Sequence, residues 1–308
     1  MILSTGMRTD IPAFYHKWLA NRFKEGFVLV RNPYYKNQIL RYELNPNVID
    51  VVTFCTKNPW PLIPYLDVLN DYRLFWFMTI TPYGKDIEPN VIHVDKAIEG
   101  FIELSKRYGK NKIVWRYDPI FYYERFDRKR HIKAFEYICE RLSGYTDTVI
   151  ISFLQMYKKL EKNMPGIFPP SIDEQVILVK ELVSIAKKYN INPKGCSENP
   201  KLKYIGLDMS GCQTATVLEN ACGININLDR EKPSRSNCNC ILGRDIGAYN
   251  SCMHFCKYCY ANYDIELVKK NYNLHDDNSP LLIGNVEAND EICDVKQLSN
   301  IDKRLRLF

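Results

Sequence analysis

Short apolar segments alternate with amphipathic segments along the first two-thirds of this 308-residue chain. The apolar segments are rich in β-branched and aromatic residues, which is typical of strands buried on both faces. Parallel strands need long crossover connections, so buried strands separated by helices predict a parallel sheet covered by helices. We expect strands at 1–6, 48–56, 74–81, 112–120, 148–155 and 191–198, and helices at 13–26, 60–72, 94–109, 129–144 and 171–190.

The number of strand–helix units constrains the fold further. Six units fit a β/α (TIM-like) barrel, partial or circularly permuted, better than a doubly wound sheet. The sequence contains no GxGxxG or Walker motif, which removes the usual nucleotide-binding signatures. Ser171 and Glu174 form a capping-box pattern at the start of the last of these helices.

The sequence changes character after residue 198. Residues 199–250 are rich in Cys, Asn and Gly and poor in long apolar runs, so we expect an irregular segment held together by ligands. A helix at 261–273 and a strand at 279–286 are expected after it. We therefore predict barrel units at 1–198 and a cysteine-rich, cluster-binding segment at 199–308 that completes the barrel within a single structural domain.

Eleven cysteines and a net charge of +6 limit the class of protein. The N-terminal residues lack the basic and apolar pattern of a signal peptide, and no apolar run is long enough to span a membrane, so we expect a cytoplasmic protein without a membrane partner. Cytoplasmic thiols stay reduced, so this odd number of cysteines favours metal ligation over disulfides. The charge permits a nucleic-acid partner but supports one only weakly.

Polar side chains follow several predicted strands at their C-terminal ends. In a β/α barrel these ends form the catalytic face. Each such residue could instead cap a loop or form an ion pair. The active-site candidates are Arg8, Asp10, Lys57, Asn58, Arg116, Asp118 and Glu198.

Cys252, Cys256 and Cys259 form a C-x3-C-x2-C pattern within "NSCMHFCKYCYAN" (250–262). Three thiolates on one loop can bind three corners of a [4Fe–4S] cluster and leave the fourth iron free. The competing interpretation is zinc, which needs a fourth ligand such as His254 or a cysteine of the "CNC" pair at 238–240. The spacing and the following "YAN" favour the iron–sulfur cluster.

The segment "CMHFCKYC" (252–259) resembles the motif of the radical S-adenosylmethionine (SAM) superfamily. The resemblance implies that SAM binds the fourth iron and that an electron passed into its sulfonium releases a 5′-deoxyadenosyl radical. It also implies that Tyr258 lies near the adenine, and that an electron donor such as flavodoxin or ferredoxin is a partner. Asn58, at a predicted strand end, is our second candidate for a cofactor contact. The sequence does not specify the substrate, a small molecule or a macromolecule.

The position of the motif departs from that superfamily, in which it normally follows the first barrel strand. Two explanations are open. A strand within 241–250 could lie beside the N-terminal strand, which would make the barrel circularly permuted. Otherwise the motif could hold an auxiliary cluster on a tail.

Stretches along nearly the whole chain resemble a family of bacterial proteins of unknown function that carry a C-terminal radical-SAM-like cysteine motif. The family implies no reaction. The matching stretches are "RTDIPAFY" (8–15), "TKNP" (56–59), "RYDPI" (116–120), "DIGAYNSCMHFCKYCYAN" (245–262) and "HDDNSPLLIG" (275–284).

Further cysteines precede the motif. Cys196, Cys212, Cys238 and Cys240 could bind a second [4Fe–4S] cluster or a structural zinc ion, with Cys222 as a substitute ligand. The remaining thiols, Cys55, Cys139 and Cys293, are expected to be core or incidental thiols.

The sequence therefore predicts a radical SAM enzyme acting on an unidentified substrate. Two other classes remain open. One is a zinc-stapled binding protein, for which nucleic acid is one candidate partner. The other is an iron–sulfur electron-transfer protein that never cleaves SAM.

Overall fold

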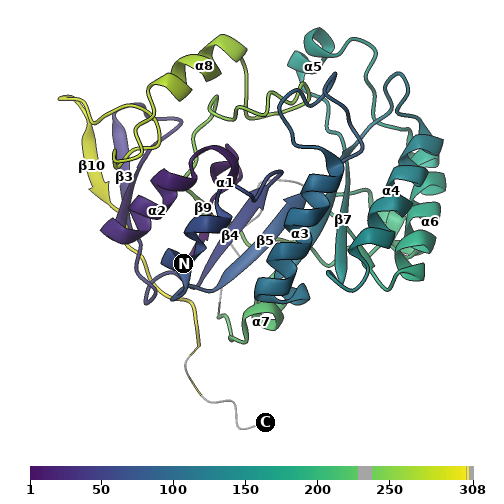
Figure 1. Cartoon of the computed structure of the whole chain (residues 1–308), viewed down its shortest axis with the longest axis horizontal. Helices are drawn as coiled ribbons and strands as arrows, with labels where there is room; N and C mark the ends of the chain where they lie inside the picture. The colour runs from purple at the N-terminus through teal and green to yellow at the C-terminus, as the bar shows by residue number, and fades with distance from the viewer. Residues whose placement is uncertain (228–237, 303, 305–308) are drawn as a thin grey trace.

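The computed structural model describes residues 1–227, 238–302 and 304. Seven strands form one sheet in the order β8-β7-β6-β5-β4-β1-β9, and every neighbouring pair is parallel (Figure 1). The predicted α/β class and its six strands are confirmed. The strands are β1 (Ile2–Ser4), β4 (Val51–Thr56), β5 (Leu74–Thr79), β6 (Ile113–Ile120), β7 (Thr148–Phe153), β8 (Asn192–Gly195) and β9 (Arg244–Asp245).

Helices cover one face of this sheet and bury the larger apolar core (Figure 1). Alternate strand residues such as Phe54, Trp76 and Trp115 point into that core, because successive side chains of a strand face opposite sides. The expected helix at 60–72 is a 3-10 helix over Ile63–Leu69, with Pro64 in its first turn, where a missing N–H costs no helical hydrogen bond. The covering helices are α1 (Ile11–Phe14), α2 (His16–Glu25), η1 (Ile63–Leu69), α3 (Val94–Tyr108), α4 (Arg128–Leu142) and α6 (Ile172–Lys188).

The opposite face of the sheet carries a smaller core. Phe75, Phe77 and Val114 pack there against Leu218 of α7 (Ala215–Cys222). This helix and the 3-10 helix η3 (Pro200–Ile205) fall in the 199–250 segment, which was expected to be irregular apart from a strand within 241–250, so two helical elements there were not predicted. Residues 228–237 of that segment lie outside the described residues.

The sheet is open in the described part of the chain, because its edge strands β8 and β9 pair with one neighbour each and not with each other. A closed barrel is therefore not formed by these residues. The strand predicted within 241–250 is present as β9, and it lies parallel to β1 as the permuted arrangement requires.

A second, three-stranded sheet was not predicted. It joins β2 (Phe27–Arg31), β3 (Gln38–Glu43) and β10 (Glu291–Asp294). The strand expected at 279–286 is absent: Leu281 makes a single bridge to Leu29, and Pro280 has no N–H to extend a ladder. The remaining elements are η2 (Lys110–Lys112), α5 (Lys158–Asn163) and α8 (Ile265–Asn273), the last close to the helix expected at 261–273.

The C-terminal residues return to the start of the chain. The indole N–H of Trp18 donates to the carbonyl of Ser279 at 2.8 Å, and Arg22 donates to the carbonyl of Asn278 at 3.0 Å. These contacts fix residues 275–284 against α2. No helix in the described ranges has the length and apolar character needed to cross a membrane.

Candidate functional site

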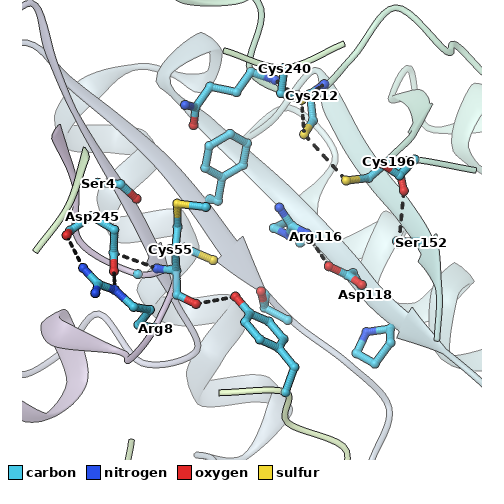
Figure 2. Close-up of a pocket in the computed structure, with 18 of the residues that line it drawn as sticks. Ser4, Arg8, Cys55, Arg116, Asp118, Ser152, Cys196, Cys212, Cys240 and Asp245 are labelled. Carbon is cyan, nitrogen blue, oxygen red and sulfur yellow. Dashed lines mark hydrogen bonds and ion pairs between the residues drawn. The ribbon is translucent and has the colours of Figure 1, made fainter. Parts of the chain in front are cut away.

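A cavity of about 790 Å³ lies at the C-terminal ends of the strands, on the face of the sheet that the large helices leave uncovered (Figure 2). Side chains of the inward-facing strand positions line it, among them Thr53, Phe77 and Ser152. Residues of the cysteine loop line it from the other side, including Tyr258, Cys259 and Tyr260. The cavity therefore joins the sheet to the C-x3-C-x2-C motif.

The cysteine loop begins five residues after β9. Asn250 and Phe255 adopt left-handed backbone conformations, with φ of 53° and 54°, and so turn the chain sharply on either side of Cys252. Burial raises the pKa of Cys252 and Cys256, and the neighbouring motif thiols raise both further. Cys252 is buried and Cys256 and Cys259 are half-buried, and a bound cation would stabilise the thiolate form of such a cluster of thiols.

Asp10 anchors this loop from the other end of the chain. Its carboxylate accepts hydrogen bonds from the backbone N–H of Lys57 at 2.8 Å and of Ala13 at 3.1 Å. The same carboxylate is bonded to the Nε2 atom of His254 at 2.8 Å. Asp10 was predicted as an active-site residue, but it is buried and not among the described residues that line the cavity. His254, which sequence analysis gave as a possible fourth zinc ligand, is therefore already paired with the Asp10 carboxylate.

Lys57 lies between the sheet and the motif. Its ammonium donates to Glu88 at 2.9 Å and to Thr81 at 3.1 Å, and it lies 5.9 Å from the centre of the Tyr258 ring. Tyr258 also donates its hydroxyl to Glu88. Burial lowers the pKa of Lys57, but Glu88 and the nearby Cys256 thiol outweigh burial and raise it. Lys57 therefore remains a cation beside the cysteine loop.

Sequence reasoning missed Glu88 and Thr81. Both follow β5, in "TPYGKDIEPN" (81–90), and a carboxylate in a loop after a strand was the available signal.

Two arginines hold positive charge at the cavity, each paired with an aspartate (Figure 2). Arg8 binds Asp245 of β9 with an Nε–Oδ2 distance of 2.6 Å, and Arg116 binds Asp118 two residues along β6. All four residues line the cavity. Together with Lys57, the structure therefore places four predicted candidates there and adds Asp245, which sequence analysis did not single out.

Two other candidates lie outside the cavity lining. Asn58 accepts a hydrogen bond from the backbone N–H of Trp60 at 3.3 Å and so caps a turn. Glu198 accepts from the backbone N–H of Phe153 at 3.0 Å, and burial raises the pKa of Glu198 to about 8. Both side chains therefore accept hydrogen bonds from the backbone at the ends of strands.

The four cysteines predicted for a second centre all line the cavity, and Cys196, Cys212 and Cys240 lie close together there (Figure 2). The Sγ atom of Cys212 lies 3.1 Å from that of Cys240 and 3.9 Å from that of Cys196. Cys238 interacts with the Cys240 thiol. Hydrogen bonding with Cys212 lowers the pKa of both Cys196 and Cys240. The described residues contain no group of three or more His, Cys, Asp and Glu side chains already arranged to hold a metal ion.

The other thiols differ in their surroundings. Cys55, expected to be a core or incidental thiol, packs against the smaller core and also lines the cavity. Cys139 is fully buried in α4, as expected. Cys222 ends α7 and Cys293 lies on β10, and neither lines the cavity among the described residues.

A known protein family matches this chain over most of its length. No curated protein matches the chain. The family described as "Domain of unknown function (DUF1848)" matches residues 2–261, which span the whole seven-stranded sheet, the cavity lining and all three motif cysteines. The chain therefore belongs to the DUF1848 family.

Proposed function

We propose that this protein is a radical SAM enzyme built on a partial, circularly permuted β/α barrel. In this arrangement β9 takes the place of the first barrel strand and β1 that of the second. The parallel pairing of β9 with β1 supports the proposal, because it brings the late motif to the strand end where the superfamily carries it. The alternative, an auxiliary cluster on a tail, does not account for that pairing.

One observation carries the proposal: the C-x3-C-x2-C loop borders the cavity at the C-terminal ends of the strands. A cluster bound by Cys252, Cys256 and Cys259 would therefore lie beside the space available to a substrate. The chemistry of these donors suits iron, since thiolates are the usual ligands of iron–sulfur clusters. Three of them leave one iron free for a non-protein ligand.

Cys252, Cys256 and Cys259 would hold a [4Fe–4S] cluster, which, once reduced, would supply the single electron needed for the cleavage of bound SAM into methionine and a 5′-deoxyadenosyl radical. The chain's own residues bind, orient and shield the reactants. The Asp10–His254 pair holds the loop to α1, and the Lys57–Glu88–Tyr258 group fixes the aromatic ring at the cavity edge. The Lys57 ammonium offsets part of the thiolate charge at Cys256.

The size of the cavity bears on the reactants. Ligand pockets are commonly 300–1,000 Å³, so about 790 Å³ is enough for SAM together with a small molecule or one end of a larger one. Arg8 and Arg116 are already paired with aspartates, so the described lining offers little net charge to a strongly anionic substrate. An external electron donor such as flavodoxin or ferredoxin completes the proposed reaction.

The test is formation of 5′-deoxyadenosine. The full chain, purified and reconstituted with iron and sulfide without oxygen, is mixed with SAM and dithionite, and the product is measured by mass spectrometry. We expect product from the wild type and none from Cys256→Ala. The matched control, Cys293→Ala, removes a thiol far along the chain on β10 and should match the wild type.

Each other outcome excludes the proposal in a recognisable way. Product from Cys256→Ala would show that the assignment of the motif is wrong. Iron without product would indicate an electron-transfer protein, and zinc without iron would indicate a metal-stapled binding protein.

A further inference from the structure

Four thiols that line the cavity lead to an inference that does not depend on SAM cleavage: Cys196, Cys212, Cys238 and Cys240. They come from three separate segments: Cys196 follows β8, Cys212 precedes α7, and Cys238 with Cys240 precedes β9. All four line the cavity, although nothing in the proposed reaction uses them. The geometry points to a site for one tetrahedral thiolate-bound metal ion, zinc being the best fit, formed by Cys196, Cys212, Cys238 and Cys240.

The sulfur spacing favours one ion over a second cluster. Four thiolates around a single zinc ion, with Zn–S bonds of about 2.3 Å and tetrahedral angles, lie about 3.8 Å apart. The observed Sγ–Sγ distance of 3.9 Å between Cys212 and Cys196 matches that spacing, and the distance of 3.1 Å between Cys212 and Cys240 is shorter still. In a [4Fe–4S] cluster each thiolate binds a different iron, so the sulfurs are held farther apart than around one ion.

The backbone at Cys240 gives a second, independent observation. Its Sγ atom accepts hydrogen bonds from the backbone N–H groups of Cys212 and Gln213, both at 3.3 Å. Two N–H donors converging on one sulfur stabilise a thiolate, which is the form that binds metal. The Arg116 guanidinium interacts electrostatically with both Cys196 and Cys212 and would offset part of the negative charge of a four-thiolate site.

The thiols do not yet surround a common point, which agrees with the absence of a preformed metal site in the described ranges. Cys212 lies between Cys196 and Cys240 (Figure 2). Metal binding would draw the Cys196, Cys212 and Cys240 thiols around the ion and bring in Cys238, which already contacts Cys240 and Ser197. A site filled by four cysteines has no open position, so its role is structural. The bound ion would hold the segments that precede α7 and β9 against the end of β8.

The experiment measures metal content and the spectrum of bound cobalt. The full chain carrying Cys252→Ala, Cys256→Ala and Cys259→Ala together is used first, so that iron at the motif cannot contribute. We expect about one zinc per chain, and we expect Co²⁺ in its place to give the intense visible bands of tetrahedral thiolate coordination. The cobalt spectrum does not depend on activity, so a failure here leaves the proposed radical reaction standing.

Variants then identify the ligands. Cys212→Ser and Cys240→Ser should each lose the zinc and the tetrahedral cobalt spectrum. Cys222→Ser, which changes a nearby half-buried thiol at the end of α7, should retain both. Four irons per chain in the motif-free protein would overturn the inference in favour of a cluster. A Cys212–Cys240 disulfide with no bound metal, detected by mass spectrometry of the untreated protein, would overturn it as well.

Discussion

At the scale of single residues, the site is held together by buried polar groups whose partners come from distant parts of the chain. Sequence position suggested that polar residues at strand ends would face a substrate. For Arg8, Lys57, Arg116 and Asp118 the structure places the side chains at the cavity. The others serve structural hydrogen bonds, because a buried carboxylate such as Asp10 or Glu198 must find donors and the nearest donors are backbone N–H groups. Sequence alone could not separate these roles, since both need the same residue types.

Asp10→Asn tests the anchoring of the cysteine loop. The change keeps the size of the side chain but removes the charge that receives hydrogen bonds from Lys57 and His254. We expect the free energy of unfolding of the metal-free protein to fall by about 2 kcal/mol, which is typical for hydrogen bonds to a charged group. Urea unfolding measures it. Asp277→Asn is the control, because Asp277 makes a comparable but more exposed contact to His275; an equal loss in both variants would contradict the anchoring role.

Asp208 gives a prediction for the pH dependence of stability. Burial raises its pKa, but the ion pair with Lys194 at 2.7 Å and the hydrogen bonds from Ser210 outweigh burial and lower the pKa of Asp208 to about 2. A carboxyl whose pKa is lower in the folded state stabilises the protein above its unfolded pKa, near 4, and loses that contribution as the pH falls toward 2.

Asp208→Asn should therefore cost on the order of 1–2 kcal/mol at pH 7 and progressively less below pH 4. Urea unfolding at several pH values measures the difference from the wild type. Asp147→Asn removes an exposed ion pair with Lys110 and should change stability by less than about 0.5 kcal/mol throughout. A cost for Asp208→Asn that does not change with pH would exclude a titrating ion pair.

At the scale of elements, the alternation of apolar and amphipathic segments was enough to predict the parallel sheet. Buried strands and their helices have strong periodic patterns, so β4 to β7 and the helices α3, α4 and α6 are close to their predicted ranges. The hairpin of β2 and β3 was missed, although "FVLVRNPYYKNQILRYE" (27–43) has two β-rich runs around an Asn-Pro turn. Only two residues of β9 pair with β1. The position of β9 therefore depends on these long-range contacts, which no local sequence pattern indicates.

The start of α6 offers a test at this scale. The hydroxyl of Ser171 accepts the backbone N–H of Glu174, and the Glu174 carboxylate in turn accepts the backbone N–H of Ser171 at 2.8 Å. Ser171→Ala removes the cap and should lower the free energy of unfolding by about 1 kcal/mol. Ser171→Thr keeps the acceptor and should recover most of the loss. If the two variants unfold at the same urea concentration, the cap does not contribute.

At the scale of the whole molecule, the two ends of the chain are built into one structure. β1 lies between β4 and β9, so the first strand is an interior strand of the sheet. Asp50, just before β4, accepts hydrogen bonds from Ser299 at 2.7 Å and from the backbone of Asn300 at 3.0 Å. The division at residue 198 that composition suggested therefore separates segments that share one sheet. Amino-acid composition describes each stretch of sequence by itself and does not indicate which strands pair with one another.

This arrangement predicts cooperative unfolding. With metal removed, urea unfolding followed by tryptophan fluorescence and by far-ultraviolet circular dichroism should give one transition with the same midpoint. The tryptophans all lie within residues 1–198, whereas circular dichroism also reports on α7 and α8. Two separate transitions would contradict a single structural domain and would support independent folding of the cysteine-rich segment.

The most direct test of the central claim is the electron paramagnetic resonance spectrum of the reduced protein before and after SAM is added. Wild-type protein reconstituted without oxygen should hold a [4Fe–4S] cluster at Cys252, Cys256 and Cys259, and its spectrum should change when SAM binds the free iron. Cys256→Ala should lose that SAM-sensitive spectrum, and Cys293→Ala should keep it. A reduced cluster whose spectrum is the same with and without SAM, or a wild-type protein that takes up no iron, would contradict the account.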